Sequence, residues 1–241
     1  MFKLGRAYSV RKESIEKRGA VKAKLYSICA KEVYIAAKKG TDPETNERLK
    51  RLIEKAKREQ IPSDIIKRAI DKAKGNQDVD YQEVTYEGFG PGASSFIINC
   101  LTDNVNRTVG YIRAAFNKLS KTLGVKGSVS HNYDYLGIIS FKHVNEEEIF
   151  EYLLDSGIDI IDIESEDGEV SIIASPSLIY DVKDALKEKF GEIEYTYDEI
   201  GMFAKEKITL NGEDKENFEK LLALLNDIED VNNVYHNVRM D

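Results

Sequence analysis

Apolar positions recur every three or four residues through the first third of the chain, and this spacing predicts amphipathic helices. Three such helices are expected, at 21–39, 46–59 and 63–74. Ser63 is a favoured residue for a helix N-cap, and Gly40 and Gly75 are typical of positions just after a helix. Residues 1–20 are basic and poor in apolar residues, which indicates an N-terminal arm. The sequence therefore predicts a basic helical domain over 1–78.

After residue 80 the pattern changes to short runs of alternating polarity, which are typical of strands. Strands are predicted at 84–86, 93–101 and 128–132, with a helix at 106–118. A β-α-β-β-α-β order follows, with strands at 137–141, 158–164, 169–174 and 193–202 and helices at 146–155 and 177–189. This is the element order of a ferredoxin-like unit.

The last three predicted elements are a strand, a helix and a strand, at 207–210, 213–225 and 231–238. Since they are too few to fold alone, we expect them to complete the sheet that begins after residue 79. The prediction is an α+β fold of three domains, an N-terminal three-helix bundle and two α+β domains. Their expected bounds are 1–78, then 79–136 with 205–241 as a discontinuous middle domain, and 137–204 as an inserted ferredoxin-like domain. The simpler alternative is three consecutive domains with a small hairpin-like tail.

Positive charge is concentrated at the start of the chain. Residues 1–75 hold 21 Lys and Arg against 10 Asp and Glu, whereas residues 76–241 hold 14 against 33. This asymmetry favours a basic module that meets a polyanion and is carried on an acidic body. The alternative is a lysine-rich helical bundle with an ordinary solvated surface.

Composition excludes several classes of protein. No run approaches 18 uninterrupted apolar residues, so a membrane span is not expected. The first residues contain basic side chains and no apolar core of a secretory signal. Cys29 and Cys100 both lie in apolar periodic segments, which is typical of buried thiols in a reducing compartment. We therefore expect a cytoplasmic protein.

The sequence contains no recognisable enzyme signature. His131, His143 and His236 are far apart and show no metal-ligand spacing. The glycine-rich run at 88–93 resembles a dinucleotide fingerprint only superficially. Pro91 in that run has no N–H for a phosphate, and the residues after it continue as a strand. We predict no catalytic residue, no metal and no cofactor.

Basic residues of the arm and first helix are the main candidates for contact with nucleic-acid phosphates. They are Arg6, Arg11, Lys12, Lys17, Arg18, Lys22, Lys24, Lys31, Lys38 and Lys39. Tyr8, Tyr26 and Tyr34 lie among them and are able to stack on bases, although packing between helices is the favoured interpretation for Tyr26 and Tyr34. The third helix has no Asn, Gln, Ser or Thr after its start, so base reading by that helix is not expected.

Several stretches of the chain resemble one known family. They are 41–46, 61–73, 86–92, 101–108, 127–129 and 234–237. Together they resemble the YebC family, and Gly5-Arg6-Ala7-Tyr8 resembles its YeeN-type branch. The resemblance implies a helical first domain, two α+β domains with the last inserted into the middle one, a cytoplasmic location and no cofactor. Asn104, Asn106 and Arg107 lie in one of these motifs and are further candidates for RNA contact.

The resemblance also implies a role in gene expression. Members of the family are commonly labelled probable transcriptional regulators that bind DNA, and relatives that include a mitochondrial translational activator act on the ribosome. We predict a non-enzymatic nucleic-acid-binding regulator, with ribosomal RNA as the favoured target and translation of stalling sequences as the favoured process. The alternative is a DNA-binding transcriptional regulator. A hydrolase in an acidic cleft is a third hypothesis, against which the lack of a nucleophile or metal motif argues.

Overall fold

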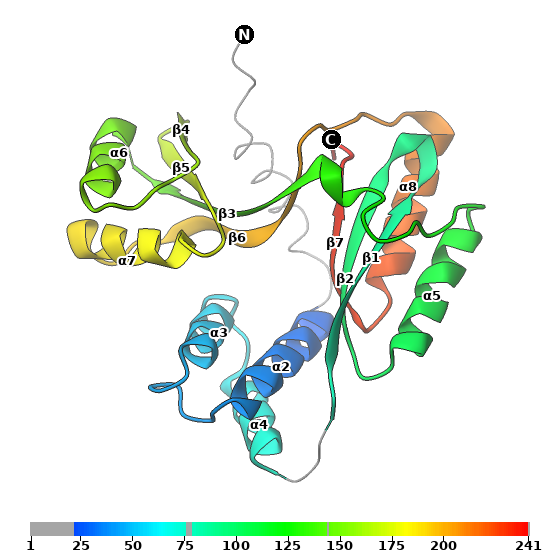
Figure 1. Cartoon of the computed structure of the whole chain (residues 1–241), viewed down its shortest axis with the longest axis horizontal. Coiled ribbons are helices and arrows are strands. Elements are labelled where there is room, and N and C mark those ends of the chain that lie inside the picture. Colours follow the sequence, from blue (N-terminus) through cyan, green and yellow to red (C-terminus); the bar gives the residue numbers. More distant parts are fainter. Residues whose placement is uncertain (1–21, 76–78, 144, 241) are drawn as a thin grey trace. The chain divides into compact units, whose positions relative to one another are not determined.

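The computed structural model describes residues 22–75, 79–143 and 145–240 (Figure 1). Within these residues it has helices and two antiparallel sheets, so the predicted α+β class is confirmed. The chain divides into two compact units. One is built on residues 131–207, and the other on residues 20–130 together with 208–239. The domain bounds given above stay a prediction.

Three helices form the first part of the discontinuous unit. They are α2 (Lys22–Lys38), α3 (Glu47–Arg58) and α4 (Ser63–Lys74). Asn46 caps α3 by accepting a hydrogen bond from the N–H of Leu49 at 3.1 Å. Its side-chain amide also donates to the carbonyl oxygens of Ala36 and Gly40, at 2.8 and 2.6 Å. A single side chain therefore fixes the turn between α2 and α3.

The predicted N-cap of the third helix is wrong by one residue. Pro62 holds the cap position with φ −56° and ψ 132°, and Ser63 is the first helical residue. The fixed φ of proline and its extended ψ place the change from extended to helical backbone at Pro62. No side-chain cap bond is needed there, and none is formed.

The middle sheet contains β1 (Gln82–Phe89), β2 (Ser95–Thr102) and β7 (Val231–His236), in the order β1-β2-β7. The last strand thus pairs with a strand near the start of the same unit, with Ile98 opposite Val234. Two helices, α5 (Val105–Asn117) and α8 (Gly212–Asn226), cover one face of this sheet. Phe96 of β2 contacts a phenylalanine from each helix, since its ring centroid lies 6.0 Å from that of Phe116 and 5.4 Å from that of Phe218.

Two predicted strands are absent from the described residues. The segment 128–132 is instead a short 3₁₀ turn, η2 (Ser130–Asn132). The carboxylate of Glu87 accepts hydrogen bonds from the N–H groups of Gly127, Val129 and Ser130, so these amides are not available to a strand ladder. The segment 207–210 contributes only an isolated bridge between Ile208 and Val238.

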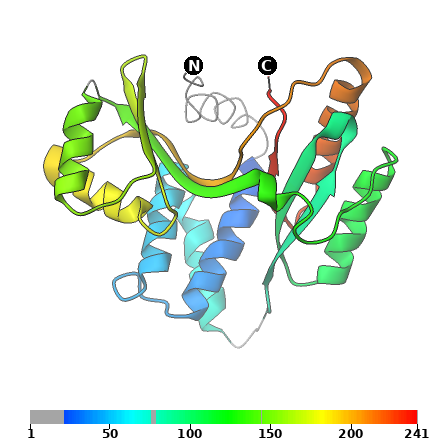
Figure 2. The same ribbon diagram turned by 45° about the horizontal axis from the view of Figure 1, so that its top comes forward.

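The unit 131–207 has the predicted ferredoxin-like topology. Its elements are β3 (Tyr133–Lys142), α6 (Glu146–Asp155), β4 (Asp162–Glu166), β5 (Glu169–Ala174), α7 (Ile179–Phe190) and β6 (Tyr195–Ala204). The sheet order is β4-β5-β3-β6 with antiparallel neighbours, and α6 and α7 cover one face (Figure 2). The first strand begins at Tyr133 and not at Gly137, because Tyr133 pairs with Ala204.

Candidate nucleic-acid interface

The described part of the helical region carries a clear excess of positive charge. Residues 22–75 hold 15 Lys and Arg side chains and 8 Asp and Glu side chains. Six of the basic side chains are exposed and make no ion pair with any other residue that the structure describes. They are Lys39, Lys50, Lys57, Lys67, Arg68 and Lys72. Such side chains are able to contact phosphates without first losing a protein partner.

The predicted site residues fall into three groups. Arg6, Arg11, Lys12, Lys17 and Arg18 lie outside the described residues. Lys22 begins α2, and Lys38 and Lys39 are exposed at its other end, where Lys38 lies 5.7 Å from the ring centroid of Tyr34.

Lys24 donates to the carbonyl oxygen of Asn226 at the end of α8. Burial lowers the pKa of Lys24, although the carboxylate of Asp227 acts in the opposite direction.

Lys31 has a different role from the predicted one. Its ammonium forms an ion pair of 3.2 Å with Asp230 and donates to the carbonyl oxygen of Leu101 at 3.4 Å. The residue is only 9% exposed. A buried and neutralised lysine is not available to a phosphate, so the prediction for Lys31 is wrong.

Asp230 is the centre of a buried polar network. Its Oδ2 accepts hydrogen bonds from Arg107 Nη2 and Thr108 Oγ1, both at 2.9 Å. Burial by itself raises the pKa of Asp230, but the hydrogen bonds from Arg107, Thr108 and Lys31 outweigh it and hold that pKa below its ordinary value. Arg107 also pairs with Asp103 at 2.8 Å. Two carboxylates therefore neutralise Arg107, and the geometry assigns it a structural contact.

The motif at 101–108 shapes the start of α5. The side chain of Asn104 caps the helix by accepting from the N–H of Arg107 at 3.0 Å. Thr102 Oγ1 accepts from the N–H of Asn104 at 2.9 Å and lies 2.8 Å from Thr108 Oγ1. The side chains of Thr102, Asn104 and Thr108 thus have local structural partners, whereas Asn106 is exposed and its candidate contact with RNA stays a prediction.

The motif at 86–92 is equally structural. Glu87 holds the 127–130 turn through three backbone N–H groups at 2.7–2.9 Å. Burial acts to raise the pKa of Glu87, but these hydrogen bonds together lower it. A Cβ at Gly88 would lie 2.7 Å from Phe116 Cε1, and one at Gly90 would lie 2.4 Å from Phe96 Cε2. Glycine is required at both positions because aromatic rings occupy the space of a side chain.

Tyr26 and Tyr34 of α2 pack in the helical core, which was the favoured interpretation of the sequence. Tyr34 is 2% exposed, and its hydroxyl accepts a hydrogen bond from the N–H of Val79 at 3.1 Å. Tyr26 packs against the same helical core. Tyr8 lies outside the described residues.

Two kinds of chemistry, metal binding and thiol reactivity, can be checked in the described part of the structure. No group of three or more His, Cys, Asp or Glu side chains there is able to hold a metal ion. Burial raises the pKa of Cys29 to about 11 and that of Cys100 to about 12, so both thiols are protonated at neutral pH. Across the described residues, no helix has the length and apolar character to cross a membrane.

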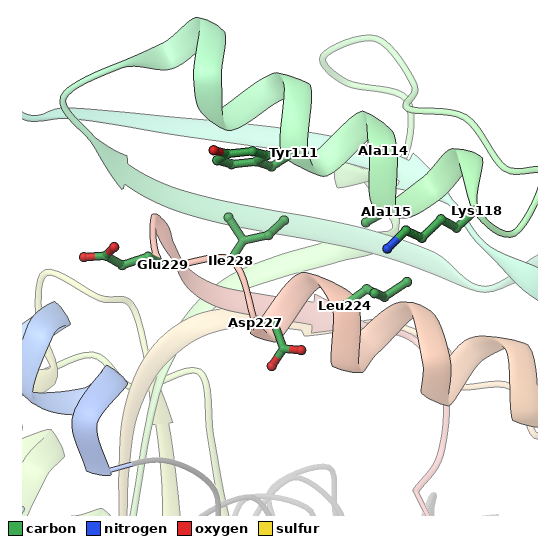
Figure 3. A pocket seen from close by; sticks show the side chains of 8 residues that line it. All are labelled: Tyr111, Ala114, Ala115, Lys118, Leu224, Asp227, Ile228 and Glu229. Atoms are coloured by element: carbon green, nitrogen blue, oxygen red, sulfur yellow. The ribbon is translucent and has the colours of Figure 1, made fainter.

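A shallow groove lies between α5 and the end of α8, where the sequence reasoning placed no site (Figure 3). Its volume is about 340 Å³. Tyr111, Ala114, Ala115 and Lys118 of α5 line one side, and Leu224, Asp227, Ile228 and Glu229 line the other. One sequence signal was available, because residues 104–121 contain four basic side chains and no acidic one.

Comparison with known families matches nearly the whole chain. Residues 6–76 match the model described as the TACO1/YebC protein N-terminal domain. Residues 81–238 match the model described as the TACO1/YebC second and third domain. The two matches meet between α4 and β1, at the end of the helical region.

Similar proteins share this length and organisation. A protein of Alcanivorax borkumensis is 44% identical over 98% of this chain and 99% of its own, and one of Acholeplasma laidlawii is 45% identical over 98% of both. Each is named a probable transcriptional regulatory protein. The crystal structure of a conserved hypothetical protein from Aquifex aeolicus matches with a TM-score of 0.72 and 31% identity, over 92% of this chain and 91% of that one. The chain therefore belongs to the TACO1/YebC family.

Proposed function

We propose that this protein is a non-enzymatic, nucleic-acid-binding regulator of gene expression that acts in the cytoplasm. The observation that carries the proposal is the separation of charge between the helical region, residues 22–75, and the unit 131–207. Residues 22–75 have a net charge of +7, from 15 basic and 8 acidic side chains. The unit 131–207 has a net charge of −14, from 6 basic and 20 acidic side chains. A polyanion is attracted by residues 22–75 and repelled by the unit 131–207.

The favoured target is ribosomal RNA, with assistance to translation of stalling sequences as the process. The exposed side chains of α4 after Ser63 are Asp64, Lys67, Arg68, Asp71, Lys72 and Lys74. Basic side chains contact phosphates and are able to pair with guanine, but α4 exposes no Asn or Gln after Ser63 that would read adenine. Affinity without sequence reading suits a structured RNA better than a promoter.

The alternative is regulation of transcription through the same helices. The names of the similar proteins favour it. Both mechanisms require the exposed basic side chains of α3 and α4, so one set of variants tests both.

The test compares two triple charge reversals in the full-length protein. The first, Lys50→Glu, Lys57→Glu and Lys67→Glu, changes exposed residues of α3 and α4. The matched control, Lys126→Glu, Lys142→Glu and Lys215→Glu, makes the same change in charge at exposed positions elsewhere. Under the proposal, the first variant leaves the ribosomal fractions of a sucrose gradient and the control stays with them. If the first variant stays on ribosomes but no longer protects a promoter duplex, the transcriptional mechanism replaces the proposed one.

A further inference from the structure

Helix α5 presents a basic face that its packing does not use. The buried side chains of the helix are Thr108, Ile112, Ala115 and Phe116. The opposite face exposes Asn106, Gly110, Tyr111, Arg113, Ala114, Asn117 and Lys118. No acidic residue lies between 104 and 121, and the exposed cations of this face, Arg113 and Lys118, attract anions to the second half of the helix.

The middle of this face is open and carries an aromatic ring. Tyr111 is 55% exposed, so one face of its ring is accessible to a ligand. A Cβ at the neighbouring Gly110 would have no atom within 4 Å. An extended ligand chain is therefore able to approach the helix backbone closely beside the ring.

The groove between α5 and α8 continues from this ring (Figure 3). Ala114, Ala115, Leu224 and Ile228 give it an apolar floor. Tyr111 lies at one end, with the side chain of Ile228 directed toward its ring, and the ammonium of Lys118 extends over the other end. Asp227 and Glu229 lie at the edge formed by the end of α8, and in Figure 3 their carboxylates point away from the ring of Tyr111.

These groups match the parts of one unpaired nucleotide. The exposed ring is a stacking surface for a base, as aromatic side chains are in proteins that bind single strands. Lys118 supplies a positive charge for the adjoining phosphate.

We propose that the groove between α5 and α8 binds an unstacked nucleotide of a single-stranded nucleic acid, with its base on Tyr111 and its phosphate at Lys118. This inference rests on the proposed function, because the helical region supplies the main phosphate contacts. The groove adjoins that region, since Lys24 of α2 donates to the carbonyl oxygen of Asn226, the residue before Asp227. A strand that follows α2 thus reaches the groove.

The test uses the full-length protein and oligonucleotides of adenine with one 2-aminopurine, as RNA and as DNA, beside a duplex of equal length. Stacking on Tyr111 quenches 2-aminopurine fluorescence. Tyr111→Leu should abolish most of the quench and weaken single-strand binding about ten-fold, with duplex binding unchanged. Tyr111→Phe keeps the ring, so its fluorescence quench and its single-strand affinity should be near those of the wild-type protein. Lys118→Gln should lower the salt slope by about 0.7. Tyr135→Leu and Lys142→Gln, at exposed positions of the acidic unit, are the controls.

The outcomes separate this inference from the proposed function. If the wild-type protein binds the single strands and Tyr111→Leu binds them equally well with the same quench, the groove takes another ligand, such as an apolar side chain of a partner protein, and the inference fails. If the wild-type protein binds none of the oligonucleotides, the proposed function fails as well. A quench with the RNA strand alone assigns the groove to RNA, and an equal quench with both assigns it to single strands in general. Both of these results support the inference.

Discussion

Lys31 of α2 and Asp230 before β7 form a buried ion pair, with 3.2 Å between Nζ and Oδ1. Their side chains are 10% and 7% exposed, and 199 positions separate them in the sequence. Asp230 also binds Arg107 and Thr108 of α5. One carboxylate therefore joins the helical region to the middle sheet and its helix, within a single compact unit.

Replacing this carboxylate should destabilise the unit strongly. Asp230→Asn leaves the buried ammonium of Lys31 and the guanidinium of Arg107 without their shared counter-charge. We expect a loss of about 3 kcal/mol in the free energy of unfolding, measured by urea denaturation. Asp71→Asn is the matched control, because Asp71 pairs with Lys74 at an exposed position and should cost less than about 0.5 kcal/mol. Equal stabilities of the two variants would contradict the role given to Asp230.

Glu87 should make stability depend on pH in the acid range. Its pKa in the folded protein lies below the ordinary value of 4.5. The carboxylate therefore stabilises the fold fully above about pH 4.5, and this contribution disappears as the pH falls through the folded pKa.

The variant Glu87→Gln lacks this contribution, because the amide is uncharged and replaces one of the two acceptor oxygens with an NH2 donor that faces backbone N–H groups. The variant should be about 2 kcal/mol less stable than wild type at neutral pH, and the gap should narrow on acidification. Urea denaturation from pH 7 down to about pH 3 measures this. Glu83→Gln, an exposed change on the same strand, is the control. A gap that stays constant with pH would show that the charge of Glu87 is not involved.

The arm should contribute to nucleic-acid binding without contributing to the fold. Removing residues 1–20 takes away six basic side chains, and the described elements begin after them, at Lys22. If about 4–6 phosphate contacts are lost, the log–log salt slope on single strands should fall by about 3–4. The melting temperature should stay near that of wild type. Unchanged affinity and slope would place the whole interface on the described helices and the α5 face.

The ferredoxin-like unit, residues 131–207, should fold as an isolated fragment. The N–H of Lys205 donates to the carbonyl oxygen of Asn132 at 2.9 Å, so the chain enters and leaves the unit at neighbouring positions. We propose that residues 131–207 form an inserted domain, and expect a cooperative thermal melt from this fragment. Joining Ser130 to Ile208 through a short Gly/Ser bridge should leave the remaining unit folded. Aggregation of both products would favour three consecutive domains instead.

Most helices and strands were predictable because each buries one face with a regular period. The predicted bounds of β5 are the observed ones, 169–174, and α8 differs from the prediction by one residue at each end. Predictions failed where a distant side chain determines the backbone. The strand expected at 128–132 does not form, because Glu87 binds two amides of that segment and the amide of Gly127 just before it, from 40 or more positions away.

The candidate site was predictable only in part, for the same reason. An excess of Lys and Arg is visible in the sequence, but their partners are not. Nothing in the sequence distinguishes Lys31 from the other lysines of α2, and only the fold brings it to Asp230. The groove at Tyr111 is likewise made by two helices that meet in the tertiary structure.

The two buried cysteines should react very slowly with thiol reagents in the native protein. With pKa values of about 11 and 12, Cys29 and Cys100 carry a thiolate in roughly one molecule per ten thousand or fewer at neutral pH. Activity should therefore be insensitive to mild peroxide. A single cysteine introduced at an exposed position outside the proposed groove, such as Lys126, becomes the dominant site for a maleimide probe without prior removal of the native thiols. Fluorescent or spin labels at chosen points then test the proposed binding of nucleic acid in real time.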